Sequence, residues 1–99
     1  MHPRDATGFE WDDENVGHLA AHRITQYEAE EVFFNGAVWA RNTGEHSADY
    51  RMMGWTDGGR PIKLLVTADS ETRNMRIITG WDIEKKDYDK YLAGRRPIR

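Results

Sequence analysis

The hydrophobic pattern of this chain changes its period once, at Asn35-Gly36, and this change constrains the fold more than any other feature. Before Gly36, apolar residues recur at the spacing of an amphipathic helix; after it, they alternate as in strands. Asn and Gly both tolerate positive φ, so the pair is a typical helix end. The chain is therefore predicted to have a helical first third and a strand-rich remainder.

Two short helices joined by a tight turn are predicted before Gly36. Asp12 can cap the first helix, which is expected to end near His22 or Arg23. Thr25 and Glu28 match a capping box, in which each side chain bonds to the other residue's backbone amide, and they open the second helix. The buried face of the second helix is predicted to consist of Ala29, Val32 and Phe33.

Strands are predicted on both sides of this helical hairpin. A brief edge strand is expected at 9–12, and Asp57-Gly58-Gly59-Arg60 reads as a hairpin turn. The remaining predicted strands span 38–41, 50–56, 62–67 and 75–80. Asp82 can cap a last helix, whose apolar face is Tyr88, Tyr91 and Leu92. The order predicts an α+β fold: an antiparallel β-meander, a two-helix hairpin before it and one C-terminal helix, with the helices on one sheet face.

Length and composition predict one domain over 1–99, with an ordered core at about 9–94. The chain has no cysteine, which excludes disulfides and thiolate metal sites and fits a reducing compartment. No apolar run approaches the ~20 residues that span a bilayer, and residues 1–8 lack the apolar centre of a secretion signal. A cytoplasmic protein without a membrane partner is the expectation.

The net charge of −3 is unevenly distributed. Residues 1–50 hold three basic and ten acidic side chains, whereas 51–99 hold eleven basic and seven acidic ones. The acidic total argues against avid nonspecific RNA binding. The basic second half leaves room for a local phosphate site or an acidic partner, with Lys85 and Lys86 as candidate RNA contacts or simply as a solvated helix face.

Several motifs together resemble the BrnT family, small ribonuclease toxins of bacterial toxin–antitoxin pairs with a RelE-like fold. They are the opening Phe9-Glu10-Trp11-Asp12, the histidine His22, the second helix at 28–33, the turn Gly59-Arg60, the strand 76–80 and the late Tyr91. The resemblance spans roughly 9–92. Trp55 and Trp81 stand where the family commonly has arginines.

The resemblance implies a type II toxin: a metal-independent endoribonuclease without a cofactor, neutralised by a cognate ribbon-helix-helix antitoxin. Such cleavage needs a base, an acid and cations for the charge that grows on phosphorus. His22 is the candidate acid or base, because imidazole titrates near neutrality. Arg76 and Arg60 are candidate phosphate clamps, and Tyr91 can orient phosphate or supply a proton. Trp55 or Trp81 can stack on a base. This hypothesis expects His22 and Arg76 to converge on one solvent-open hollow lined by the sheet.

Each of these residues also has a purely structural interpretation. His22 can lie at the end of its helix, where a protonated imidazole complements the helix dipole. Arg76 can pair with a carboxylate, and Arg60 can simply be a residue of the turn. Tryptophans in place of arginines favour burial in a core or an interface. The alternative hypothesis is therefore a catalytically inactive BrnT-like module that binds protein and can form a homodimer. No metal site is predicted, because His18 and His22 share a helix face but further ligands would have to come from elsewhere.

Overall fold

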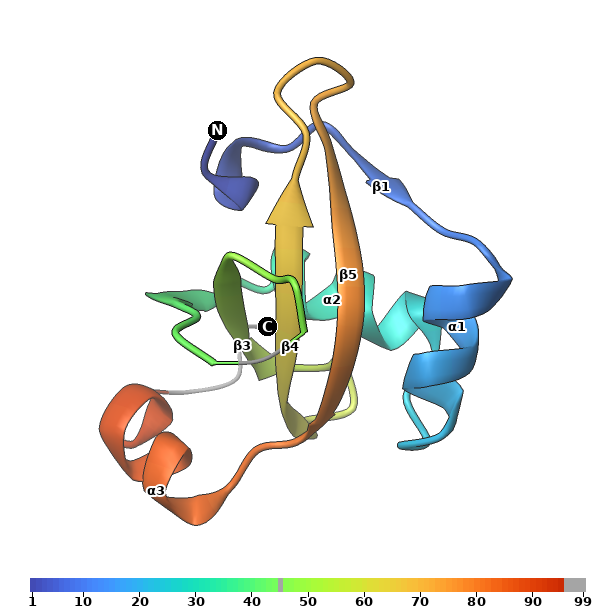
Figure 1. Cartoon of the computed structure of the whole chain (residues 1–99). Coiled ribbons are helices and arrows are strands. Elements are labelled where there is room, and N and C mark those ends of the chain that lie inside the picture. Colours follow the sequence, from blue (N-terminus) through green and yellow to red (C-terminus); the bar gives the residue numbers. More distant parts are fainter. Residues whose placement is uncertain (45, 96–99) are drawn as a thin grey trace.

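The computed structural model describes residues 1–44 and 46–95 and has an α+β architecture with a five-stranded mixed sheet (Figure 1). The N-terminus forms a single 3-10 turn, η1 (Pro3–Asp5). The strands are β1 (Gly8–Glu10), β2 (Val38–Arg41), β3 (Tyr50–Trp55), β4 (Pro61–Ala68) and β5 (Asn74–Asp82). The helices are α1 (Asp13–Ala20), α2 (Gln26–Phe34) and α3 (Lys85–Asp87), the last continuing into a π-helical turn, η2 (Tyr88–Leu92). The predicted order of elements is confirmed.

The sheet has the order β1-β5-β4-β3-β2. β2 to β5 form the predicted antiparallel meander, and β1 is the predicted edge strand. However, β1 pairs with β5 in parallel, with Gly8 opposite Asn74 and Glu10 opposite Arg76, so the sheet is mixed rather than wholly antiparallel. The prediction failed here because no hairpin joins these two strands, and turn geometry therefore does not fix their relative direction.

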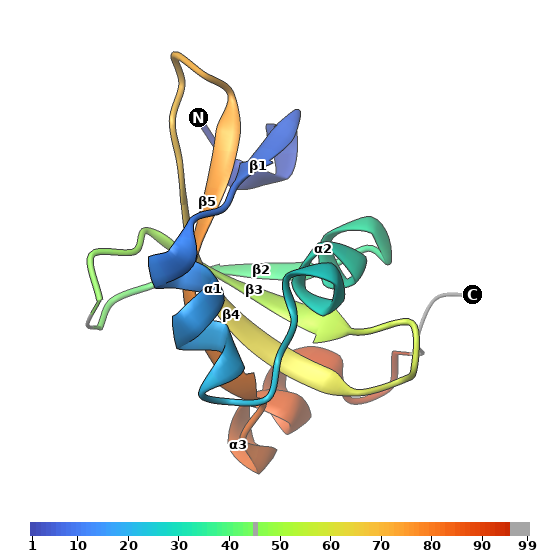
Figure 2. The same cartoon turned by 90° about the vertical axis from the view of Figure 1, so that its right-hand side faces the viewer.

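The helices cover both faces of the sheet, which corrects the prediction that they share one. Figure 2 shows α2 on one side of the sheet and α3 on the other. Met52 belongs to the cluster under α1 and α2, whereas its neighbour Met53 packs with Leu92 of η2. Successive strand residues point to opposite faces, so this pair marks two apolar layers. Both faces of β3 and β4 are consequently buried over much of their length.

Local sequence signals set the helix boundaries. The predicted caps of α1 and α2 are present: Asp12 accepts from the Asn15 amide, and Thr25 and Glu28 form a reciprocal capping box. Helix α1 ends at Ala20 with Ala21 as its C-cap residue, and the chain then leaves through a Schellman motif with Arg23 in the left-handed region (φ 59°). The helix thus ends at Ala20, shortly before the predicted end near His22 or Arg23, and the Schellman turn spans the predicted position.

The predicted cap at Asp82 is wrong. β5 continues through Asp82, whose carboxylate accepts from Arg60, and Glu84 occupies the cap position of α3 without a side-chain bond. Pairing of Asp82 with Ile62 extends the ladder, and this tertiary contact overrides the capping preference. Within residues 1–44 and 46–95, no helix has the length and apolarity needed to cross a membrane.

The surroundings of Gly80 on β5 show how tightly the side chains between the sheet and helices α1 and α2 are packed. A Cβ on Gly80 would lie 2.5 Å from Leu64 Cδ2, 2.9 Å from the Lys63 carbonyl oxygen and 3.3 Å from Leu19 Cδ2. We expect Gly80→Ala to destabilise the fold by roughly 1–3 kcal/mol, because the backbone oxygen cannot move aside. Gly17 in α1 is the matched control, since a Cβ there meets nothing within 4 Å. Gly17→Ala is expected to stabilise by about 0.5–1 kcal/mol. Urea unfolding measures both, and an unchanged midpoint for Gly80→Ala would contradict the packing argument.

Candidate functional site

A hollow of about 230 Å³ opens on the sheet face that carries α3. Its walls come from the segment after β2 and from β3, β4 and β5, and its lining residues are Asn42, Thr43, Gly44, His46, Arg51, Lys63, Leu65 and Trp81. The hollow therefore combines two cations, an imidazole and an indole. It lies beside the part of the sheet face that α3 and η2 cover through Met53.

Strand register explains why these side chains share a face. Arg51 is opposite Leu65, and Leu65 is opposite Thr79. Further along the same two strands, on the same face, Lys63 of β4 is opposite Trp81 of β5. Directly paired residues, and residues two apart on a strand, point the same way. The meander thus gathers side chains from three strands on one surface.

A second hollow of about 180 Å³ shares His46 with the first and is lined also by His18, Ala21, His22 and Thr79. Helix α1 supplies His18 and the turn after it supplies His22, because the helix lies along β5 beyond the end of β1. Asn15 Nδ2 donates to the carbonyl of Ile77, and His18 Nδ1 lies 3.2 Å from the carbonyl of Ile78. These contacts fall at an irregularity of the β4–β5 ladder, where Leu65 pairs with Thr79 and Val66 with Ile77. Asn15 thus ties the helix to the β5 backbone just past the last residue that β1 pairs with.

Trp81 connects the two hollows. Its ring centroid lies 6.0 Å from that of His22 and 6.3 Å from that of His46. On the sheet surface, Lys63 Nζ lies 5.3 Å from the centroid of the same indole. Two imidazoles thus flank an aromatic surface with a cation beside it.

The two cations of the site are held by the C-terminal segment. Lys63 Nζ donates to Asp87 at 2.7 Å and lies 3.9 Å from Glu84. This donation holds the pKa of the Asp87 carboxyl below its usual range. Arg51 donates to the Tyr91 hydroxyl at 3.3 Å and to the carbonyl of Arg41 at 3.2 Å. Lys63 is therefore largely charge-compensated, whereas the hydrogen-bond acceptors of Arg51 are neutral oxygens and its positive charge acts on Asp87 without a hydrogen bond, helping to lower the pKa of that carboxyl.

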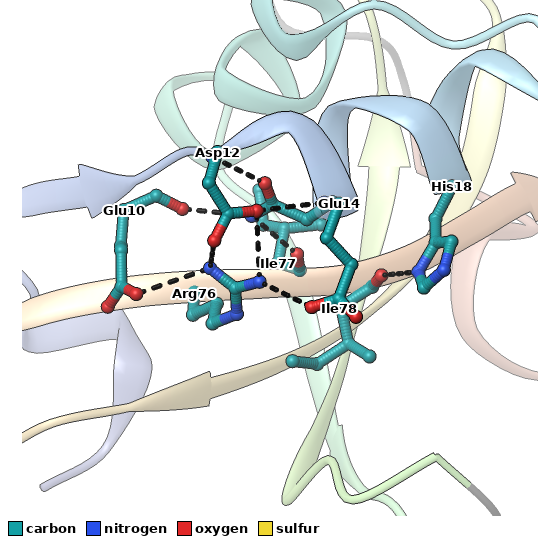
Figure 3. Close-up of polar contacts among 8 residues, drawn as sticks. Glu10, Asp12, Glu14, His18, Arg76, Ile77 and Ile78 are labelled. Carbon is teal, nitrogen blue, oxygen red and sulfur yellow. Dashed lines mark hydrogen bonds and ion pairs between the residues drawn. The ribbon is translucent and has the colours of Figure 1, made fainter.

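Arg76 lines neither hollow. Its guanidinium donates to the carboxylates of Glu10, Asp12 and Glu14, at distances of 2.9–3.2 Å (Figure 3). The bonds with Asp12 raise the pKa of Arg76 and lower that of Asp12. The Arg76 side chain is 19% exposed, and it ties β5 to the start of α1. The structure thus does not bring Arg76 and His22 to one hollow.

Arg60, like Arg76, forms its hydrogen bonds and ion pairs away from the two hollows. It donates to the carbonyls of His22 and Arg23, where α1 ends, and to Asp82 at 2.7 Å. Glu28 lies 3.8 Å away. Helix ends leave carbonyls without intrahelical partners, and Arg60 supplies the missing donors.

The other predicted site residues separate into two groups. Trp81 reaches the hollow, and Tyr91 contacts it through Arg51. Trp55 is buried against Tyr88 in the α3 layer, with ring centroids 6.3 Å apart. Lys85 and Lys86 are exposed on α3, and Lys85 pairs with Asp89 one helical turn away. Of these residues, only Trp81 and Tyr91 belong to the environment of the hollow.

Sequence reasoning missed Arg51, Lys63, His46 and Asp87. A signal existed for Lys63, because it is a single cation inside the apolar run Ile62 to Val66 and must find a partner when buried. Arg51 lies two residues from Met53, so alternation places both on one face. His46 offered no signal, since it follows a strand by five residues in a loop without periodicity.

Comparisons with family models, curated proteins and solved structures produced no match to this chain. The chemistry that this site can perform is therefore inferred from the residues that form it. Among the described residues, no group of three or more His, Cys, Asp or Glu side chains is arranged to hold a metal ion. The geometry can bind an anion between Arg51 and Lys63, stack a planar ring on Trp81 and exchange protons through imidazole.

Proposed function

We propose that this chain is a BrnT-like endoribonuclease toxin that cleaves single-stranded RNA without a metal ion, at the two hollows around Trp81. One observation carries the proposal: His22 and His46 both lie next to the Trp81 indole and line the same hollow. The resemblance to BrnT toxins, with their RelE-like fold, supports the same reaction class.

The chemistry requires two proton-transfer groups and a cation. A neutral imidazole removes the proton of the ribose 2′-hydroxyl, and the 2′-oxygen attacks the adjacent phosphorus. The bond from phosphorus to the 5′-oxygen breaks, and the second imidazole, initially protonated, gives its proton to that oxygen. The products carry a 2′,3′-cyclic phosphate and a 5′-hydroxyl. In this proposal His22 and His46 are the acid–base pair.

Arg51 and Lys63 act on the phosphate in the proposed mechanism. The charge of a phosphorane is spread over its equatorial oxygens, and nearby cations stabilise it more than the ground state. Arg51 suits this role because its described hydrogen-bond acceptors are neutral oxygens, and guanidinium can bond two phosphate oxygens at once. Trp81 supplies the stacking surface on which an unpaired base rests, which favours single-stranded over paired RNA.

Arg51→Gln tests the proposal against Arg76→Gln as the matched control. The full-length protein is incubated with a long RNA in excess EDTA, and the product ends are analysed. We expect cleavage with cyclic phosphate ends, and a loss of about 100-fold in rate for Arg51→Gln. Arg76→Gln is expected to retain most of the rate, because Arg76 pairs with carboxylates outside the hollows. Wild-type cleavage no greater than that of a mock purification, or equal losses in both variants, would refute the assignment.

In the BrnT-like proposal a ribbon-helix-helix antitoxin neutralises the enzyme. Growth arrest on expression of this chain alone, relieved by the protein from the adjacent reading frame, would support that partner.

The alternative is a non-catalytic protein-binding module, with a homodimer as one form. The observation that favours it is charge compensation: Lys63, Arg60 and Arg76 each pair with carboxylates of the same chain. RNA cleavage by purified protein separates the two proposals.

A further inference from the structure

The outward face of α2 carries two large aromatic side chains that remain mostly exposed to solvent. Tyr27 is 69% exposed and Phe34 is 71% exposed. They are seven residues apart, so they lie on one helix face two turns from each other. Ala29 and Val32 point the opposite way into the core. Large apolar side chains exposed at this spacing are typical of a helix that binds a partner.

Neighbouring rings extend this surface beyond the helix. The Phe34 ring lies 5.2 Å from Phe33 and 6.0 Å from Phe9 of β1. Trp11, which is half-buried, donates from Nε1 to Glu30 at 2.8 Å. The aromatic surface thus continues from the outer side of α2 toward β1, on the sheet side opposite to α3.

The charged side chains of α2 itself all have one sign, although Arg60 lies 3.8 Å from Glu28 at the start of the helix. Glu30 and Glu31 lie between Tyr27 and Phe34 on the helix, and residues 24–40 contain no Lys, Arg or His. Glu31 accepts from the amide of Asp57, which adds another carboxyl group at the turn after β3. Both glutamates are held in place by donors on neighbouring elements. The surface is therefore apolar at its ends and negative at its centre.

We propose that this face, formed by Tyr27, Glu30, Glu31 and Phe34, binds a basic amphipathic helix of another protein. The partner's apolar side chains would cover Tyr27 and Phe34, and its Lys or Arg side chains would meet the two glutamates. A second copy of this chain fits poorly, since an antiparallel two-fold pair of α2 helices would bring Glu30 and Glu31 against their own copies. RNA is repelled by the same carboxylates. The interaction does not depend on the proposed ribonuclease activity, because the hollows open on the other face of the sheet.

The test uses synthetic helical peptides and the full-length protein. The first peptide has leucines along one face and lysines along the other, and the second has glutamates in place of the lysines. Binding is measured by fluorescence anisotropy at low and high salt. We expect the lysine peptide to bind at least about tenfold more tightly than the glutamate peptide, with affinity decreasing as salt increases.

Two double variants locate the binding surface. Tyr27→Ser with Phe34→Ser, and Glu30→Gln with Glu31→Gln, are each expected to weaken binding about tenfold or more. Glutamine keeps the acceptor oxygens that bond Trp11 and Asp57, so the second variant changes charge with little change in structure. Glu71→Gln with Asp89→Asn removes the same charge elsewhere and should leave affinity unchanged.

Equal binding of both peptides, or equal losses in the test and control variants, would overturn the proposal. A concentration-dependent dimer in sedimentation that Phe34→Ser abolishes would also overturn it, in favour of a second copy on this face. Circular dichroism of every variant checks that α2 and the sheet remain folded.

Discussion

His46→Ala is expected to lower the rate of RNA cleavage by about 100- to 10,000-fold, the range that a positioned acid or base contributes. His22→Ala should cause a loss of the same order. The double variant should lose little more than either single variant, because an acid and a base acting in one step are not additive. The rate of the wild type should pass through a maximum with pH, since one imidazole must be neutral and the other protonated.

His2→Ala is the control for these histidine variants. His2 packs against Trp39 and Tyr50, with ring centroids 5.2 and 4.5 Å apart, and it lines neither hollow. Single-turnover cleavage of a short RNA separates the chemical step from binding. Full activity in both His46→Ala and His22→Ala would rule out the hypothesis that these groups act as acid and base. If the rate of the chemical step were unchanged and only RNA binding were weaker, the two histidines would contact the RNA without taking part in catalysis.

The order of elements was predictable because local signals and tertiary contacts agree. The capping box at Thr25 and Glu28, the positive φ of Gly36 (83°) and the turn at Gly59 (φ 87°) all lie where residue type predicts them. In each case the preferred backbone conformation depends on one or two neighbouring residues. A single sequence is enough for such features.

The parallel β1–β5 pair and the division of the helices between faces were not predictable in the same way. Phe9 and Met75 are paired although most of the chain separates them, and no local preference encodes that contact. Likewise, Leu92 of η2 packs with Met53 of β3, and no preference local to either residue encodes that contact. Both errors arise from long-range geometry.

The candidate site was predicted only in part for a related reason. The chemistry of their side chains predicts His22 and Trp81 as site residues, and both line hollows at the site. Arg76 is predicted for the same reason, but three nearby carboxylates engage its guanidinium. Charge in a sequence shows which groups can bind phosphate, whereas the fold decides which of them remain available. Arg51 became a candidate only when strand register placed it beside Lys63 and Trp81.

Asp87→Asn is expected to destabilise the protein by roughly 3 kcal/mol at neutral pH, because removing one member of a buried ion pair leaves the other charge uncompensated. Asp87 and Lys63 are 7% and 8% exposed, and their 2.7 Å bond joins α3 to the centre of the sheet. Glu84, 3.9 Å from Lys63 Nζ, can recover part of the loss. Asp89→Asn, which breaks an exposed pair with Lys85, is the control and should cost much less.

The pH dependence of stability gives this prediction a second measurement. Lys63 lowers the pKa of Asp87 in the folded state, so the pair adds stability above the ordinary aspartate pKa of about 4. That stability is lost as the pH falls through the lowered pKa. Urea unfolding of wild type and Asp87→Asn should therefore differ most near neutral pH and converge on acidification. A constant difference across the acid range would mean that the pair does not titrate as described.

Replacing both members of the pair separates their structural role from their proposed functional one. Lys63→Met with Asp87→Leu removes two buried charges and keeps similar volumes, so most of the stability lost in Asp87→Asn should return. The same double variant lacks the cation beside Trp81 and is expected to cleave RNA about 100-fold more slowly than wild type. Recovered folding with lost cleavage would indicate that the fold keeps Lys63 for the phosphate, and that Asp87 serves to hold this charge in an otherwise apolar layer. Recovered folding with full cleavage would leave the pair a purely structural link between α3 and the sheet, and Arg51 would remain as the phosphate-binding cation.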